Sequence, residues 1–232
     1  MQVAIMQPYF LPYIGYFQLI AAADVFVIYD NIKYTKKGWI NRNRFLLNGQ
    51  DALFSLPLKK ASDACTVVER ELSIDYDRTS LRRQFQNHYA HAPNFARTDA
   101  LLERIFNFAD NNLFFYIHNA VTAICEHIGI KTTIVISSAL AVDHLAKGQD
   151  KVIRICQALQ ADNYVNAIGG TELYSAVDFS NAGIQLKFLK SNSIQYSQFD
   201  KPFVPWLSIV DVLMFNRVEE VHRLVHTEYR MI

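Results

Sequence analysis

The amino-acid sequence predicts an α/β protein with a Rossmann-like, mostly parallel sheet, on three observations. Residues 3–6 and 24–30 are short apolar runs on either side of a predicted helix over residues 13–22. This strand–helix–strand order is typical of a βαβ unit, in which the two strands lie parallel. The same alternation returns after residue 130. Because the chain has 232 residues and is 51% hydrophobic, we expect a single α/β domain over residues 1–232 with one substantial core.

The individual elements follow from apolar periodicity and from residues that end helices and strands. Pro8 and Pro12 end the first strand, and Pro12 suits the first turn of the helix that follows. Residues 75–130 show helical spacing and predict three helices, packed as an insert or as a flanking layer, with Gly129 ending the last one. The remaining predicted elements are strands at 132–136, 164–168 and 184–189, a helix at 150–159 and C-terminal helices within 207–232.

Charge and cysteine content exclude several classes of protein. Lysine and arginine number 23 against 22 acidic residues, a balance that disfavours nucleic acid as a partner. No apolar run approaches the ~20 residues of a membrane span, and the N-terminus lacks the basic region of a signal peptide. Three cysteines without metal-ligand spacing predict structural thiols in a reducing compartment. We therefore expect a cytoplasmic protein without a membrane span.

The loop after the first strand is the strongest candidate for a binding site. It joins a strand end to a helix N-terminus, whose unpaired N–H groups suit a phosphate or a carboxylate. In open α/β sheets ligands bind at this edge. Gly15 indicates either close approach of a ligand or tight helix packing, and both interpretations stay open. The candidate binding residues of this loop are Gln7, Tyr9, Tyr13, Gly15 and Tyr16.

A basic stretch from residue 33 to residue 44 could hold a diphosphate. Arginine forks match phosphate oxygens and lysine adds point charge, while a tryptophan could stack on a base or a sugar. The alternative is an ordinary solvated charged face. The candidates in this stretch are Lys37, Trp39, Arg42 and Arg44 for binding and Asn41 for catalysis.

Three acids and a glycine pair are further candidates. Asp30 ends the second strand at the ligand-binding edge and could be a general base, and Glu172 follows Gly169 and Gly170 after a late strand. Asp211 stands in an otherwise apolar helix, so it is either paired or retained for binding. Ordinary caps or ion pairs are the alternative for each acid. His222 and His226 have the spacing of a metal-binding pair on a helix, but the sequence offers no third ligand near them. No metal site is therefore predicted.

Two resemblances add to these inferences. Residues 13–16, Tyr-Ile-Gly-Tyr, resemble the His-x-Gly-His helix start of nucleotidyltransferases and class I aminoacyl-tRNA synthetases, with tyrosine at both histidine positions. That resemblance implies a nucleotidyltransferase-like (HUP-like) variant of the Rossmann-like sheet. Gly169-Gly170-Thr171-Glu172 is similar to the paired glycines of the synthetases.

Longer blocks resemble the WbqC-like protein family and recur in order along most of the chain. They are residues 6–17, Asp30, residues 37–44, Ser137-Ser138, residues 164–174 and residues 207–214. The family is associated with bacterial surface-polysaccharide (O-antigen) gene clusters. The resemblance implies a cytoplasmic step on a sugar precursor carried on a nucleotide diphosphate, and it supplies no catalytic residue.

Together these observations lead to the hypothesis of a transferase that installs an acyl or aminoacyl group on a nucleotide-linked amino sugar. Asp30 or Glu172 would accept the proton of the attacking amine, and Asn41 or the N–H groups of Gly169 and Gly170 would polarise the acyl carbonyl. The acyl donor could be bound to a carrier, and a homodimer is compatible with the 13% aromatic content.

Two alternatives stay open. The first is a nucleotidyltransferase or adenylating enzyme on the same fold, which would need Mg²⁺. The second is a non-catalytic protein that binds a sugar nucleotide or serves assembly within a polysaccharide complex. In each case the expected partner is a nucleotide-linked sugar or another phosphorylated small molecule. The cofactor is otherwise unknown, and the sequence identifies neither the sugar nor the donor.

Overall fold

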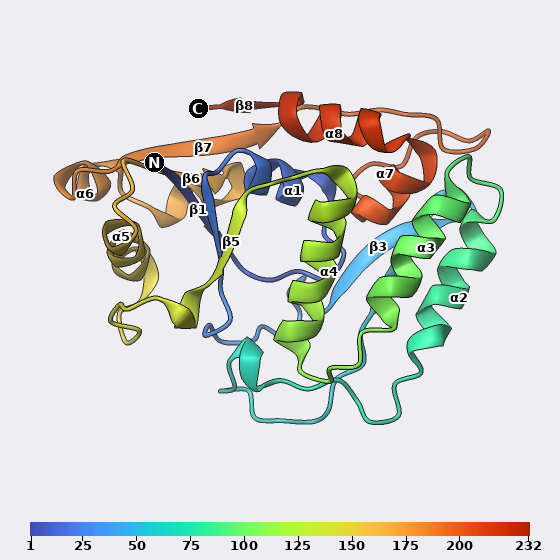
Figure 1. Ribbon diagram of the computed structural model, residues 1–232, viewed down its shortest axis with the longest axis horizontal. Helices are drawn as coiled ribbons and strands as arrows, with labels where there is room; N and C mark the ends of the chain where they lie inside the picture. The colour runs from blue at the N-terminus through green and yellow to red at the C-terminus, as the bar shows by residue number, and fades with distance from the viewer.

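The protein forms a six-stranded sheet, shown in a computed structural model that describes residues 1–232 (Figure 1). The strand order is β5-β2-β1-β6-β7-β8, and every neighbouring pair is parallel except the last, β7 and β8. The strands are β1 (Gln2–Met6), β2 (Val25–Ile28), β5 (Thr133–Ile136), β6 (Asn163–Ala167), β7 (Gln185–Ser191) and β8 (Tyr229–Met231). The predicted α/β fold with a mostly parallel, Rossmann-like sheet is confirmed.

The central strands are buried on both faces, because alternate side chains enter two separate core clusters. In β1, Ala4 belongs to the larger cluster, whereas Val3 and Ile5 belong to the smaller one. The larger cluster takes in α1 (Ile14–Ala21), α4 (Leu113–Ile128), α7 (Ile209–Phe215) and α8 (Val218–Thr227), and the smaller one takes in α5 (Gly148–Ala158) and α6 (Ala176–Asn181). Helices therefore cover both faces, as parallel sheets require.

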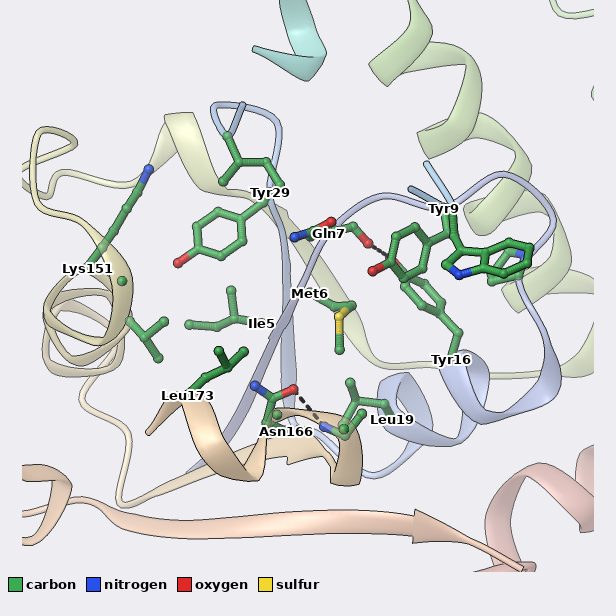
Figure 2. A pocket seen from close by; sticks show the side chains of 18 of the residues that line it. Ile5, Met6, Gln7, Tyr9, Tyr16, Leu19, Tyr29, Lys151, Asn166 and Leu173 are labelled. Atoms are coloured by element: carbon green, nitrogen blue, oxygen red, sulfur yellow. Dashed lines mark hydrogen bonds between the residues drawn. The ribbon is translucent and has the colours of Figure 1, made fainter. Parts of the chain in front are cut away.

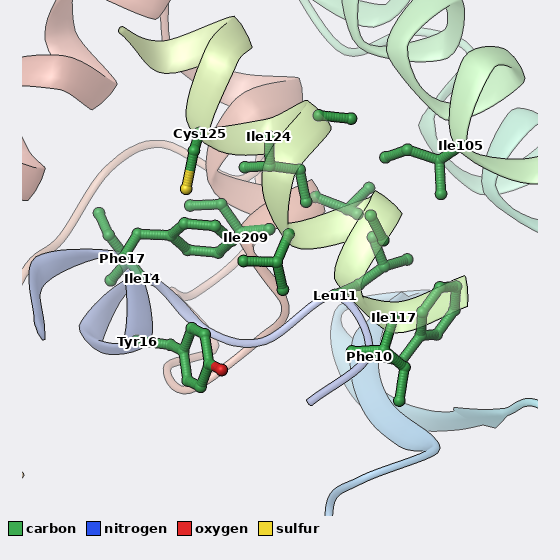
Figure 3. Packing of buried hydrophobic residues seen from close by; sticks show 14 of the residues in the cluster. Phe10, Leu11, Ile14, Tyr16, Phe17, Ile105, Ile117, Ile124, Cys125 and Ile209 are labelled. Atoms are coloured by element: carbon green, nitrogen blue, oxygen red, sulfur yellow. The ribbon is translucent and has the colours of Figure 1, made fainter. Parts of the chain in front are cut away.

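Three helices occupy the region for which the sequence predicted them: α2 (Arg78–Tyr89), α3 (Phe95–Phe106) and α4. Gly129 ends α4 in the left-handed conformation, with φ of 78°, where a side chain would be strained. The helices share the larger core cluster with the loop after β1, and Figure 3 shows Phe10 and Leu11 of that loop near Ile117 of α4. The helical region thus shares one hydrophobic core with α1, α7 and α8 and packs against the first loop.

Residues 42–55 form an antiparallel hairpin that we did not predict. Its strands are β3 (Arg42–Leu47) and β4 (Gln50–Ser55), joined by Asn48 and Gly49 with φ of 54° and 83°. An Asn-Gly pair between strands favours this two-residue turn because both residues tolerate positive φ. The signal was therefore present in the sequence.

Other boundaries also differ from the predictions. Pro12 precedes the first helix, since α1 begins at Ile14 with Tyr13 as its N-cap. Residues 207–232 are not helical throughout, because the chain ends in strand β8, whose partner β7 is brought to it only by the tertiary fold. Also unpredicted were α6 and the short 3-10 helices η1 (Val67–Glu69), η2 (Ser137–Ala139) and η3 (Ile168–Leu173). None of the helices combines the length and the apolar character that crossing a membrane requires.

A buried carboxylate connects α7 with the helical layer and with the segment that precedes α7. Asp211 is fully buried and accepts hydrogen bonds from Tyr89 of α2 (2.8 Å), from Tyr196 (2.6 Å) and from Gln198 (2.6 Å). Burial raises the pKa of Asp211, whereas the three donors lower it. Of the alternatives that the sequence left open for Asp211, this network supports a hydrogen-bonded structural role.

We expect Asp211→Asn to lower the free energy of unfolding by about 1–3 kcal/mol, because the amide cannot accept from all three buried donors. Urea unfolding at pH 7 measures the change. An unfolding free energy equal to that of the wild-type protein would show that the network contributes no stability.

An ion pair ties α2 to α3. Arg82 contacts Asp99 through two nitrogens, at 2.8 and 3.0 Å, and Gln86 also donates to this carboxylate. The hydrogen bond from Arg82 lowers the pKa of Asp99. The stabilisation is therefore complete above the ordinary pKa of about 3.9 and is lost as the pH falls through the lowered pKa.

Asp99→Asn should accordingly cost about 1–3 kcal/mol at pH 7 and progressively less below pH ~4. Urea titrations at several pH values measure how the difference in unfolding free energy between the variant and the wild type decreases. The exposed Asp200, changed to Asn, serves as the matched control and should change stability little at any of them. A deficit that stays constant down to pH 2 would contradict the assignment.

Candidate functional site

A cavity of about 1080 Å³ opens at the carboxyl edge of the sheet, where β1, β2 and β6 end. From β1 the chain crosses to β2 on one side, whereas β6 lies on the other side of β1 and is reached through α5. The strand order therefore reverses between β1 and β6, and ligands of open α/β sheets bind at such a switch point. Met6 and Gln7, Tyr29 and Asn31, and Asn166 and Ala167 bring the three strand ends to the cavity wall.

The aspartate-free and glutamate-free lining of the cavity is positively charged. Four cationic side chains line the cavity, and no aspartate or glutamate does. They are Lys33, Arg44, Lys147 and Lys151. The N-terminal ends of α1 and α5 also reach the wall, at Gly15 and at Gly148, and such helix ends carry partial positive charge. The cavity is therefore suited to an anion.

The loop after β1 forms one wall and is held in an unusual conformation. Leu11 is fully buried with φ of 47°, a left-handed backbone that costs a residue with a side chain about 1–3 kcal/mol. Its carbonyl accepts hydrogen bonds from Asn43 (2.9 Å) and from the Ser208 hydroxyl (2.7 Å). Ile209 donates to the next carbonyl, that of Pro12, at 2.8 Å. Segments from two distant parts of the sequence, at residue 43 and at residues 208–209, thus fix the loop.

Tyrosines from this wall face the cavity. The Tyr16 hydroxyl donates to the Gln7 carbonyl at 2.9 Å, and the rings of Tyr9 and Tyr16 lie 5.7 Å apart (Figure 2). Burial raises the pKa of Tyr9 and of Tyr16, so both hydroxyls stay protonated. The Tyr13 ring lies over Gly15 so closely that a Cβ there would be 2.2 Å from the Tyr13 hydroxyl oxygen. A larger residue at position 15 would therefore displace the Tyr13 ring from its present place.

Both tryptophans of the chain line the cavity and are exposed. Trp39 is 42% exposed and has the Arg44 guanidinium 5.2 Å from its ring centre. Trp206 is 62% exposed and lies 5.9 Å from the Tyr13 ring. Exposed aromatic faces beside cations are suited to a ligand that has both rings and negative charge.

The wall formed by α5 carries a polar network around Lys151. The amine of Lys151 donates to Asn31 Oδ1 at 2.9 Å and lies 5.2 Å from the centre of the Tyr29 ring (Figure 2). Ser137 donates to the same amide oxygen, and Asn31 Nδ2 lies 3.0 Å from His144 Nδ1. Burial lowers the pKa of Lys151, an effect that the nearby Asp30 partly opposes. The site therefore contains a buried amine with a weakened hold on its proton.

The structure brings together nine of the residues that we predicted from sequence. Those that line the cavity are Gln7, Tyr9, Tyr13, Gly15, Tyr16, Trp39, Arg44, Gly169 and Gly170. Those that do not line it are Asp30, Lys37, Asn41, Arg42, Glu172 and Asp211.

Several predicted residues outside the lining have structural partners. Asp30 is buried and accepts from the Ser138 N–H at 2.9 Å. Asn41 accepts from Tyr34 and donates to the Leu56 carbonyl, and Arg42 donates to the carbonyls of Gly38 and Lys37. The side chains of Lys37 and Glu172 are exposed.

Sequence reasoning missed the α5 wall, namely Asn31, His144, Lys147 and Lys151, and also Trp206. One signal could have found Lys151, because it falls on the buried face of an amphipathic helix together with Val152 and Ile155. The same criterion had singled out Asp211. No group of three or more His, Cys, Asp or Glu side chains is placed to hold a metal ion.

Comparison with known proteins agrees with the resemblance of the sequence blocks. The model of the WbqC-like protein family matches residues 7–223. An uncharacterized protein of Mycobacterium tuberculosis, Rv1507c, is 29% identical over 220 residues, which cover 93% of each chain. No solved structure matches. Since the family model covers nearly the whole length, the chain belongs to the WbqC-like protein family.

Proposed function

We propose that the protein is a transferase that acts on a nucleotide-diphosphate-linked amino sugar, in the synthesis of a bacterial surface-polysaccharide precursor such as O-antigen. The observation that carries this proposal is the cavity at the switch point, which has four cationic side chains and no acidic one in its lining. Arg44 pairs with Asp51 at 3.2 Å and Lys151 lies near Asp30, but neither acid lines the cavity, so an anionic ligand would offset the repulsion that remains among the lining charges.

The distribution of these groups suits a diphosphate in particular. Arg44 can offer a fork of N–H donors, and Lys33 and Lys147 can add point charge. The first N–H groups of α1 have no partner within the helix, and Gly15 brings that helix end to the cavity wall. Several donors around one cavity match the several oxygens of a diphosphate better than a single carboxylate.

The aromatic lining suits the rest of such a molecule. Trp39, Trp206 and Tyr13 present ring faces on which a base or a sugar can stack. At about 1080 Å³ the cavity is at the upper end of small-molecule sites, which leaves room for a second substrate. Gly169 and Gly170 lie in the wall at the end of β6, where backbone N–H groups could polarise an acyl carbonyl. Amide formation on the amino sugar is the transfer that these groups support.

Because both tryptophans line the cavity, their fluorescence can report binding directly. We expect a saturable change on titration with a UDP-linked amino sugar and a much weaker response to the free amino sugar. Arg44→Ala should weaken binding about 10- to 100-fold, since hydrogen bonds to charged groups contribute about 1.5–3 kcal/mol.

Arg154→Ala is the matched control, since Arg154 is an exposed arginine of α5 outside the lining, and its affinity should equal the wild type's. Equal binding of the free amino sugar and its UDP form would overturn the proposal. Preference for a nucleoside triphosphate with Mg²⁺, followed by pyrophosphate release, would instead establish a nucleotidyltransferase. Tight binding without turnover of any acyl donor would indicate a sugar-nucleotide-binding protein.

A further inference from the structure

We propose that Lys151 is the catalytic residue that accepts the proton of the attacking amine and that Asn31 is its positioning residue, an inference that rests on the proposed function. Among the acids that the sequence suggested for this task, neither Asp30 nor Glu172 lines the cavity, whereas Lys151 does. Geometry therefore favours the lysine for direct contact with a substrate.

The surroundings of Lys151 fix its amine while leaving the proton exchangeable. The residue is 6% exposed, on the first turn of α5, and its Nζ donates to Asn31 Oδ1 at 2.9 Å. An amide oxygen accepts a hydrogen bond from either the ammonium or the neutral amine. Asn31 can thus orient the amine in both protonation states without adding a charge.

The orientation of Asn31 is itself determined by its other partners. His144 Nε2 lies 3.0 Å from the Leu140 carbonyl, which can only accept, so that nitrogen carries the ring hydrogen of the neutral imidazole. His144 Nδ1 is then an acceptor, and it faces Asn31 Nδ2 at 3.0 Å. The amide oxygen of Asn31 consequently points to Lys151 and to the Ser137 hydroxyl.

Burial of Lys151 favours release of its proton, whereas the carboxylate near it opposes that release. Asp30 at the end of β2 is the carboxylate nearby, Tyr29 presents its ring, and His144 stands in the segment before α5. Burial lowers the pKa of Lys151 more than Asp30 raises it, so the neutral amine is more accessible here than on the surface. General bases work best when their pKa lies near the working pH.

The step balances with an acyl thioester as donor. The nitrogen of the amino sugar forms a bond to the acyl carbon, and the carbon–sulfur bond breaks. The proton from the attacking nitrogen moves to Nζ of Lys151 and from there to the departing thiolate, which leaves as a thiol. Lys151 returns to the neutral amine, so no further reactant is needed.

The first test measures the amine itself, without any assay of transfer. Trace acetylation with acetic anhydride, followed residue by residue by mass spectrometry from pH 6 to pH 11, gives the titration midpoint of each lysine. We expect the midpoint of Lys151 to lie below those of the surface lysines. Asn31→Asp should move that midpoint to higher pH, because a carboxylate at that position stabilises the ammonium.

The second test separates catalysis from binding. Lys151→Met should weaken binding of a UDP-linked amino sugar, seen by tryptophan fluorescence, less than Arg44→Ala does, while acyl transfer from acyl-coenzyme A thioesters at saturating substrate falls at least about 100-fold. Lys60→Met, at an exposed lysine outside the cavity, is the control and should keep both properties. Asn31→Asp should shift the alkaline-rising limb of the pH–rate profile together with the Lys151 midpoint.

Three results would overturn this inference: a Lys151 midpoint equal to those of surface lysines, full turnover by Lys151→Met, or a pH–rate profile that Asn31→Asp leaves unmoved. In each of these the wild-type protein still binds the nucleotide sugar, so the proposed function survives. Failure of the wild-type protein to bind any nucleotide-linked amino sugar would instead remove the proposed function, and with it the role of Lys151.

Discussion

The carbonyl oxygen of Leu11 accepts hydrogen bonds from Asn43 and Ser208, and this contact fixes the wall on which the cavity depends. The left-handed backbone of Leu11 is unfavourable by about 1–3 kcal/mol, so it persists only because other interactions over-determine it. Full burial of Phe10 and Leu11 contributes about 1.5–3 kcal/mol each, and the two hydrogen bonds satisfy a carbonyl that would otherwise be buried unpaired. The constraint places the start of α1, with Tyr13 and Gly15, at the sheet edge.

The second organising feature is that both faces of the sheet are covered. Alternate residues of β1 and β2 feed two separate clusters, which hold α1 on one face and α5 on the other. Their N-terminal ends meet at the carboxyl edge, because each helix follows a parallel strand of the same sheet. Arg44 from the hairpin and Lys147 and Lys151 from α5 thereby come to one cavity. A site assembled in this way concentrates positive charge at one edge of the sheet, with no acid in the lining itself.

Local sequence signals identified part of the predicted site, whereas long-range contacts decided which of the other predicted residues line the cavity. The loop after β1 was identified because its prolines, its glycine and its place after a strand are local signals. Arg42 and Arg44 were indistinguishable by spacing, yet Arg42 donates to nearby carbonyls whereas Arg44 lines the cavity. Residues 42 and 44 are two positions apart in β3, so their side chains point to the same face of the strand. Only the surroundings of each side chain give the two arginines different partners. The Asn48-Gly49 pair is a local signal that predicts the hairpin turn.

By itself the sequence determined the α/β class, the order of its main strands and helices and the edge at which a ligand would bind, because apolar periodicity and turn residues act over short distances. Only the tertiary structure decided which charged groups share a cavity, because some of those groups come from segments more than one hundred residues apart, as Arg44 and Lys151 do. It likewise placed Asp211 in a buried network rather than in the lining. Burial and partnership are properties of the packed chain, and they decide whether a charged residue serves structure or binding.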